Sequence, residues 1–226
     1  IVSFLYLRYA TYKYESKAVI EILDPAQDNE MALPTELTVF NRSMINLQNE
    51  INILSSFLLH ERVVEDLNYN IFYYNVGNVK STQTTAEEWF KDFELKFKSN
   101  PDKISASSSY EIMIEGGDLV IASFDSKNDM LKEYSFEKLT TKNISHDLPF
   151  DLTINQYDDD SDRSLRLSTV SSAAKYYRSL FNTTPLGSDS DQLSIKLTHE
   201  NKRVSETYLN GLLYAFDNDG VVDRQL

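Results

Sequence analysis

The stretch Gln48–Asn70, which reads QNEINILSSFLLHERVVEDLNYN, decides how this chain is expected to fold. It continues a row of apolar residues that starts upstream and comprises Leu37, Phe40, Met44, Leu47, Ile51, Leu54 and Leu58. Successive members are three or four residues apart, and this spacing puts one narrow apolar stripe along a helix. The pattern predicts a long helix from about Thr35 to about Leu54, packed on its own domain or, in part, on a neighbouring subunit.

A pair of serines, Ser55 and Ser56, interrupts this helix. Serine is a poor residue inside a helix and a good one at its N-terminus, so a second, shorter helix is expected to follow. Its inward face is expected to comprise Leu59, Val63, Val64 and Leu67, and its outward face His60, Glu61, Arg62, Glu65 and Asp66.

Much of the remaining chain alternates between apolar and polar residues, as half-buried strands do. Strands are predicted for residues 12–23, 93–98, 110–115, 119–124, 150–154, 165–167 and 193–197. Gly116-Gly117-Asp118 is expected to close a hairpin between two of these strands. Helices are predicted for residues 170–181 and 201–216, the second capped by Asn201 and ended by Asp217–Gly220.

Helices near both ends of the chain, with strands between them, indicate an α+β fold. We expect a mixed sheet packed on helices, including the one long helix, with a β-rich insertion. Residues 1–75 and 164–226 would form the α/β core, and residues 76–163 the β-rich insertion. Residues 1–8 allow two interpretations, the outer end of a truncated transmembrane helix or an ordinary first strand.

Three segments of the chain resemble the chain-length-determinant (Wzz-type) family, the polysaccharide co-polymerases. Members tend to carry a run N-E-I-x-I-L-x-S-x-x-L-x-x-x-V-V-x-x-L-N, and residues 49–68 follow it. Residues 9–23 resemble the first strand of the family, and residues 184–197 with 201–216 resemble its closing strand and helix. The order and spacing of the three matches carry the resemblance, whereas residues 82–162 match only loosely.

The resemblance implies a role for the chain as the extracytoplasmic domain of a co-polymerase at the periplasmic face of the bacterial inner membrane. Such a domain works as a membrane-anchored homo-oligomer beside a polysaccharide polymerase or an outer-membrane export channel. The resemblance allows direct contact with the polysaccharide but does not require it. Its assembly would regulate the chain length or export of a capsule or other exopolysaccharide. The resemblance also implies membrane spans on both sides of the segment and, in one branch, a cytoplasmic tyrosine kinase elsewhere in the parent chain.

Two departures from the family pattern qualify these expectations. The chain stops at Leu226, where the family normally continues into a long helical hairpin and a second membrane span. The β-rich middle is also larger than in the simplest members. We therefore expect that this segment alone need not assemble, and that the insertion is specific to this protein.

The composition of the chain excludes several classes of function. Its 226 residues, 41% of them hydrophobic, suffice for a sizeable core. A formal net charge of −13 argues against nonspecific binding to nucleic acid or anionic lipid. The absence of cysteine from the sequence excludes disulfides, thiolate metal ligands and a cysteine nucleophile.

The sequence predicts no catalytic, cofactor-binding or metal-ligating residue, so no enzyme activity is expected of this segment. His60, His146 and His199 lie far apart in sequence, which favours surface or capping roles. The turn at Asp217–Gly220 lacks the carboxylates that an EF-hand needs at loop positions one and twelve. The acidic stretch 156–162 is interpreted as a hydrated loop. Gly116-Gly117 is expected in a hairpin and not ahead of a helix, so it is not interpreted as a phosphate-binding loop.

One alternative function belongs to a different class, a soluble carbohydrate-binding or adhesion module. Its contact surface would consist of exposed aromatic side chains in the β-rich middle, such as Tyr110, Phe124 or Tyr157. A glycan hydrolase or lyase ranks third, because it needs a cleft with convergent carboxylates that no sequence pattern here indicates.

Overall fold

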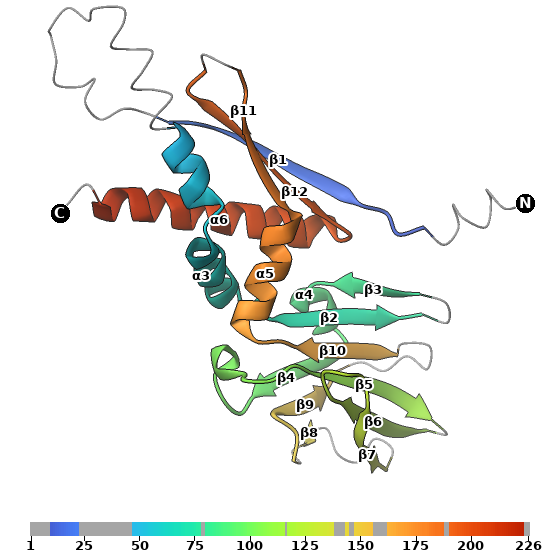
Figure 1. Cartoon of the computed structure of the whole chain (residues 1–226). Helices are drawn as coiled ribbons and strands as arrows, with labels where there is room; N and C mark the ends of the chain where they lie inside the picture. The colour runs from blue at the N-terminus through green and yellow to red at the C-terminus, as the bar shows by residue number, and fades with distance from the viewer. Residues whose placement is uncertain are drawn as a thin grey trace, which may run out of the picture. The chain divides into compact units, whose positions relative to one another are not determined.

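The computed structural model describes residues 10–22, 47–77, 80–115, 117–137, 143–144, 147–155, 162–187 and 190–223 (Figure 1). The chain divides into two compact units. Unit 1 comprises Ile1–Tyr12 and Val64–Ala173, and unit 2 comprises Lys13–Val63 and Ala174–Leu226. Both contain helices and strands, so the α+β class is confirmed. The chain passes from one unit to the other at residues 12/13, 63/64 and 173/174. The core and insertion predicted from the sequence had their bounds at residues 75/76 and 163/164.

Unit 2 contains a three-stranded sheet in the order β1-β12-β11. The strands are β1 (Tyr14–Glu21), β12 (Gln192–His199) and β11 (Phe181–Pro185). The central strand, β12, pairs antiparallel with both neighbours, and helix α6 (Lys202–Asp223) lies along β1 and β12 (Figure 1). The sheet therefore joins segments from opposite ends of the sequence.

The alternation predicted for residues 193–197 explains which face of this sheet is covered. Leu193, Ile195 and Leu197 on β12 are all fully buried. On the other face of β12, Lys196 forms an ion pair with Glu15 of β1, with 3.0 Å between Nζ and Oε1. One face is thus apolar and packed, and the opposite face is polar, as expected for an antiparallel sheet with one solvated side.

The interrupted helix at the start of the decisive stretch is observed where the structure describes it. Residues 47–54 are helical, with Leu47 and Leu54 buried, and α3 (Phe57–Leu67) follows the Ser55-Ser56 break. The expected start of the helix near Thr35 lies outside the described residues. Leu58 was expected on the apolar stripe, but it is 75% exposed. The helix is interrupted at Ser55-Ser56, so the spacing of four residues from Leu54 no longer places Leu58 on the same face.

The expected outward face of α3 is wrong at one position, His60, which is completely buried. Leu59, Val63 and Val64 are buried as predicted. An amphipathic pattern treats histidine as polar and therefore assigns it to solvent, whereas here its ring is packed between aromatic rings. The helix ends at Asn68, whose φ of 53° lies in the left-handed region that closes many helices.

Unit 1 contains two antiparallel sheets. The larger has the order β3-β2-β10-β5-β6-β7, and the smaller the order β4-β9-β8. The strands of the larger sheet are β2 (Ile71–Val76), β3 (Ser81–Thr84), β5 (Ser108–Glu115), β6 (Asp118–Phe124), β7 (Met130–Phe136) and β10 (Arg163–Leu167). The strands of the smaller sheet are β4 (Phe93–Phe97), β8 (Asn143–Ile144) and β9 (Phe150–Ile154). A short helix, α4 (Ala86–Trp89), and a 3-10 turn, η2 (Pro101–Lys103), connect them.

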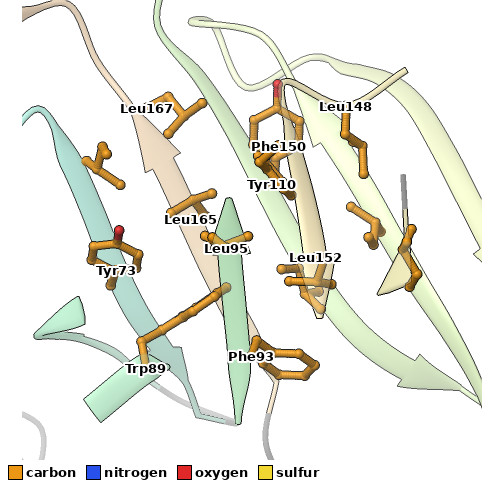
Figure 2. Close-up of a cluster of buried hydrophobic side chains, with 14 of the residues drawn as sticks. Tyr73, Trp89, Phe93, Leu95, Tyr110, Leu148, Phe150, Leu152, Leu165 and Leu167 are labelled. Carbon is orange, nitrogen blue, oxygen red and sulfur yellow. The ribbon is translucent and has the colours of Figure 1, made fainter. Parts of the chain in front are cut away.

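The two sheets of unit 1 enclose an aromatic core between them (Figure 2). Trp89, Phe93 and Phe150 are each at most 1% exposed. In Figure 2 the side chains of β4 and β9 point toward Tyr73 of β2 and Tyr110 of β5. Rings of this size bury 150–250 Å² each in proteins in general, so they dominate the stabilisation of such a core.

Three expectations about the architecture need correction. Every strand pair in the described part of the chain is antiparallel, so the sheets are not mixed. Strands that follow one another through short loops, such as β5 and β6, can pair only in this way. Helix α6 does not end at Asp217–Gly220 but runs to Asp223.

Strands β2, β3, β7, β8 and β11 were not predicted. The hairpin expected at Gly116-Gly117 is confirmed by the pairing of Glu115 with Asp118.

Two further predictions are confirmed, helix α5 (Val170–Leu180) and the capping role of Asn201 at the start of α6. The α5 residues Ala173, Ala174 and Tyr177 are buried as expected. Phe181 is not part of that helix but starts β11, where it is half-buried.

Candidate functional site

The most unusual arrangement in the described part of the chain is a stack of four buried rings in unit 2, which we call the His–Tyr stack. Its members are His60 of α3, Tyr208 of α6, Tyr177 of α5 and His199 of β12. None is more than 2% exposed. The centroids of Tyr177 and Tyr208 are 4.4 Å apart with nearly parallel planes, and each tyrosine also stacks on one histidine.

His60 occupies one end of the His–Tyr stack. Its Nδ1 lies 2.8 Å from the hydroxyl oxygen of Tyr208, and the edge of its ring meets the ring of Phe181. Its Nε2 is buried and makes no hydrogen bond of good geometry, and the Leu54 backbone is the polar group that interacts with the ring. Burial lowers the pKa of His60 to about 4, and the positive charge of Arg178 acts in the same direction.

His199 occupies the other end of the stack. Its Nδ1 accepts a hydrogen bond of 2.9 Å from the backbone N–H of Asn201, and its Nε2 is buried without a partner. Burial lowers the pKa of His199, whereas Asn201 and Glu200 oppose this shift. His199 thus helps to set the turn before α6, which agrees with the expected capping role, but it is not a surface residue.

The His–Tyr stack is suited to packing rather than to chemistry. Two tyrosine rings separate the histidines, and burial raises the pKa of Tyr208, so its hydroxyl stays neutral. Within the described ranges, no group of three or more His, Asp or Glu side chains could hold a metal ion. A neutral, closed aromatic cluster of this kind fixes four elements of unit 2 against one another.

The other candidate positions from the sequence do not come together. His146 and most of the acidic stretch 156–162 lie outside the described residues. Asp217 and Asn218 are exposed positions on α6 and do not form a loop. Gly117 has a φ of 94° beside the β5–β6 turn, which is why glycine suits that position.

The contact surface expected of a carbohydrate-binding module is not supported. Tyr110 is only 8% exposed and belongs to the core of unit 1, where its ring meets that of Phe150 edge to face. Phe124 is half-buried, and Tyr157 lies outside the described residues. The choice of Tyr110 is wrong because it lies on the covered face of β5, a fact that depends on the neighbouring sheet.

Exposed apolar side chains are concentrated in unit 2. Among the described residues, nine large apolar side chains are exposed. Those of unit 2 are Tyr14, Val19, Leu58, Tyr176, Leu186 and Tyr214, and those of unit 1 are Tyr12, Met130 and Leu131. The three most exposed are Leu58 and Tyr214 of unit 2, at 75% and 71%, and Tyr12 of unit 1, at 71%. These side chains are positions at which an apolar contact with another molecule would form, and a contact surface needs several of them to be contiguous.

Comparisons with known proteins do not extend this picture. No protein-family model matches the sequence, and no curated protein matches it. Among the described helices, none is both long and apolar enough to cross a membrane. Residues 1–8, for which a membrane span was one interpretation, lie outside the described part.

Sequence reasoning missed the His–Tyr stack because its members are far apart in the chain. Position 60 is separated from position 208 by 148 residues. The only signal in the sequence was the position of Tyr177 and Tyr208 on the apolar faces of their helices. This spacing predicts that the rings are buried, but it does not predict which residues they contact.

Proposed function

We propose that this chain is a non-catalytic scaffold, the extracytoplasmic domain of a polysaccharide co-polymerase. In this role it regulates the chain length or export of a surface polysaccharide through homo-oligomeric assembly. Its partners are further copies of itself and a polysaccharide polymerase or an outer-membrane export channel. It works at the periplasmic face of the bacterial inner membrane, held there by flanking spans of the parent protein.

The observation that supports this proposal most is the location of the three segments that resemble the family. Residues 184–197 and 201–216 belong to unit 2, as do residues 13–23 of the first segment and 49–63 of the second, whereas residues 9–12 and 64–68 belong to unit 1. Residues of the first segment form β1, those of the last form β12 and the start of α6, and these three elements pack together. The pairing of the first segment with the last supports the proposal that they belong to one domain of the family type.

A second observation concerns how such a scaffold would meet its neighbours. Six of the nine exposed large apolar side chains, those named above, belong to unit 2. Burial of an exposed leucine or tyrosine against another copy is favourable by about 1.5–3 kcal/mol per side chain. Unit 2 therefore offers the surface through which copies would associate.

The test is to change one exposed apolar residue in each unit and measure assembly. The variants are Leu58→Glu in unit 2 and, as the matched control, Leu131→Glu in unit 1, which have 75% and 65% exposure in the wild type. Each is made in the natural protein that contains this chain, purified in detergent, and its mass determined by light scattering. The length distribution of the surface polysaccharide is measured on gels from the same strains.

We expect the wild type to form a closed homo-oligomer. L58E should lower its mass and alter the polysaccharide length distribution, and L131E should change neither. A wild-type protein that is monomeric in detergent, with an unaltered polysaccharide after gene deletion, would overturn the proposal. An L131E variant as impaired as L58E would refute the assignment of assembly to unit 2.

A further inference from the structure

The His–Tyr stack places a histidine at the junction of several elements of unit 2, and the pKa of this side chain in water is 6.5. His60 lies near the start of α3 and touches Tyr208 of α6 and Phe181 of β11. Two residues of the helix break lie close by, since Leu54 interacts with His60 through its backbone and the Ser55 carbonyl accepts a hydrogen bond from Arg178 Nε. A change at this ring therefore affects contacts among the helical segment 47–54, α3, α5, α6 and β11.

The surroundings of His60 favour its neutral form. Its ring is completely buried, and the titratable or charged groups that face it are the Tyr208 hydroxyl and the Arg178 guanidinium. A proton added to His60 would create a buried cation near a second cation. Such a charge has to be paired or returned to water, and water can reach the ring only if its contacts with Tyr208 and Phe181 open.

The far end of the stack responds in the same direction. The Nδ1 of His199 accepts the backbone N–H of Asn201, and a protonated Nδ1 would lose this bond, although it could donate instead to the Asn201 carbonyl oxygen at 3.2 Å. The charged or titratable groups that face His199 are Glu200 and the hydroxyl-bearing rings of Tyr176 and Tyr177. The Asn201 backbone and Glu200 both favour the protonated ring and partly offset the effect of burial, so His60 is the more sensitive end.

We propose that the His–Tyr stack is an acid-sensitive latch, in which a proton taken up by His60 opens the contact of the first turns of α3 with α6 and β11. The latch acts within unit 2. Among the described residues, the aromatic core of unit 1 contains no histidine, so we expect its packing to be unchanged under the same conditions. This inference goes beyond the proposed function and does not depend on it.

The direction of the effect follows from where His60 binds protons. Its pKa is about 4 in the folded unit and 6.5 when the ring is in water. The open state therefore binds more protons below pH 6.5, and the stability that is complete above pH 6.5 is lost progressively as the pH falls toward 4. For these two values the opening equilibrium constant rises about twentyfold between pH 7 and pH 5.

The experiment is hydrogen exchange of the 226-residue chain at pH 7.0 and pH 5.0, corrected for intrinsic exchange rates. We expect peptides from residues 57–63 and from α6 to lose protection about twentyfold at pH 5.0. The fluorescence of Trp89, the only tryptophan of the chain and a fully buried residue of unit 1, should stay unchanged. A pH of 5.0 keeps most carboxylates ionised, so their titration does not confuse the result.

Two variants assign the effect to His60. His60→Phe keeps an aromatic ring but cannot take up a proton, and His60→Gln keeps a polar group near Tyr208. Both should show less than a threefold change in protection between the two pH values. A wild type with unchanged protection at pH 5.0, or an undiminished acid response in both variants, would overturn the proposal.

A second readout covers the case in which both variants fold poorly. The His60 ring proton resonance of the wild type is followed by NMR from pH 8 to pH 4. An apparent midpoint well below 6.5, accompanied by loss of the Tyr208 contact, supports the latch. A midpoint near 6.5 with the Tyr208 contact intact contradicts the latch, because His60 would then take up a proton as readily in the closed state as in water.

Discussion

At the scale of single residues, Phe150 shows what stabilises unit 1. It is completely buried on β9, and its ring meets Tyr110 of the opposing sheet at a centroid distance of 5.1 Å. It also meets Phe97 of β4, its neighbour in the smaller sheet, at 6.1 Å. One side chain thus contributes to the contact within the smaller sheet and to the contact between the two sheets (Figure 2).

Truncation of this side chain should therefore destabilise unit 1 strongly. We expect Phe150→Ala to lower the free energy of unfolding by about 3–5 kcal/mol, through lost burial and the cavity that remains. Urea unfolding followed by Trp89 fluorescence measures this, since Trp89 lies in the same core.

The matched control is Leu131→Ala on β7, where the side chain is 65% exposed. It should change the free energy of unfolding by less than about 0.5 kcal/mol. Equal losses for the two variants would mean that the aromatic core does not dominate the stability of unit 1.

At the scale of elements, the start of α6 depends on one side chain. The Oδ1 of Asn201 accepts hydrogen bonds from the backbone N–H groups of Arg203 and Val204, at 2.9 and 3.1 Å. The first N–H groups of a helix have no partner within the helix, so a capping side chain stabilises the whole element. Because α6 lies along β1 and β12, its position also supports the sheet of unit 2.

Asn201→Ala should lower the stability of unit 2 by about 1 kcal/mol. Hydrogen exchange of α6 at pH 7 measures this as a loss of protection of about fivefold. Asn210→Ala, an exposed position on the same helix, is the matched control and should be neutral or slightly stabilising, since alanine is the better helix former. Protection that falls equally in both variants would show that the cap is not the cause.

At the scale of the whole molecule, charge governs how copies approach one another. The formal net charge of −13 makes any two copies repel. The Debye length falls from about 20 Å to about 6 Å as the salt concentration rises from about 20 to about 300 mM. Apolar contacts between copies are not weakened by this change, whereas the repulsion is.

Self-association of the natural protein should therefore strengthen with salt over this range. Sedimentation velocity in detergent at the two salt concentrations measures the shift from smaller species to the assembly. Dissociation at the higher salt would instead indicate that pairs of opposite charge hold the copies together, and the exposed apolar side chains of unit 2 would not be the contact surface.

Part of this fold could be read from the sequence because it rests on local periodicity. The alternation in residues 93–97 and 193–197 and the helical spacing in residues 57–67 and 170–180 predict elements that the structure contains. The two glycines of the β5–β6 hairpin and the cap at Asn201 are signals of two or three residues, and they too were sufficient. Strands such as β2 and β11 were missed because their burial comes from neighbours in the sheet rather than from a repeating pattern.

By itself, the sequence determined the α+β class, the net negative charge, and those helices and strands that have a regular apolar pattern. Only the tertiary structure decided that β1 pairs with β12, that the sheets are antiparallel, and that Tyr110 belongs to a core. It alone brought His60 beside Tyr208, across 148 residues of chain. Periodicity reports which face of an element is apolar, because that depends on nearby residues, whereas the partner of that face is selected by packing and hydrogen bonding between segments distant in sequence.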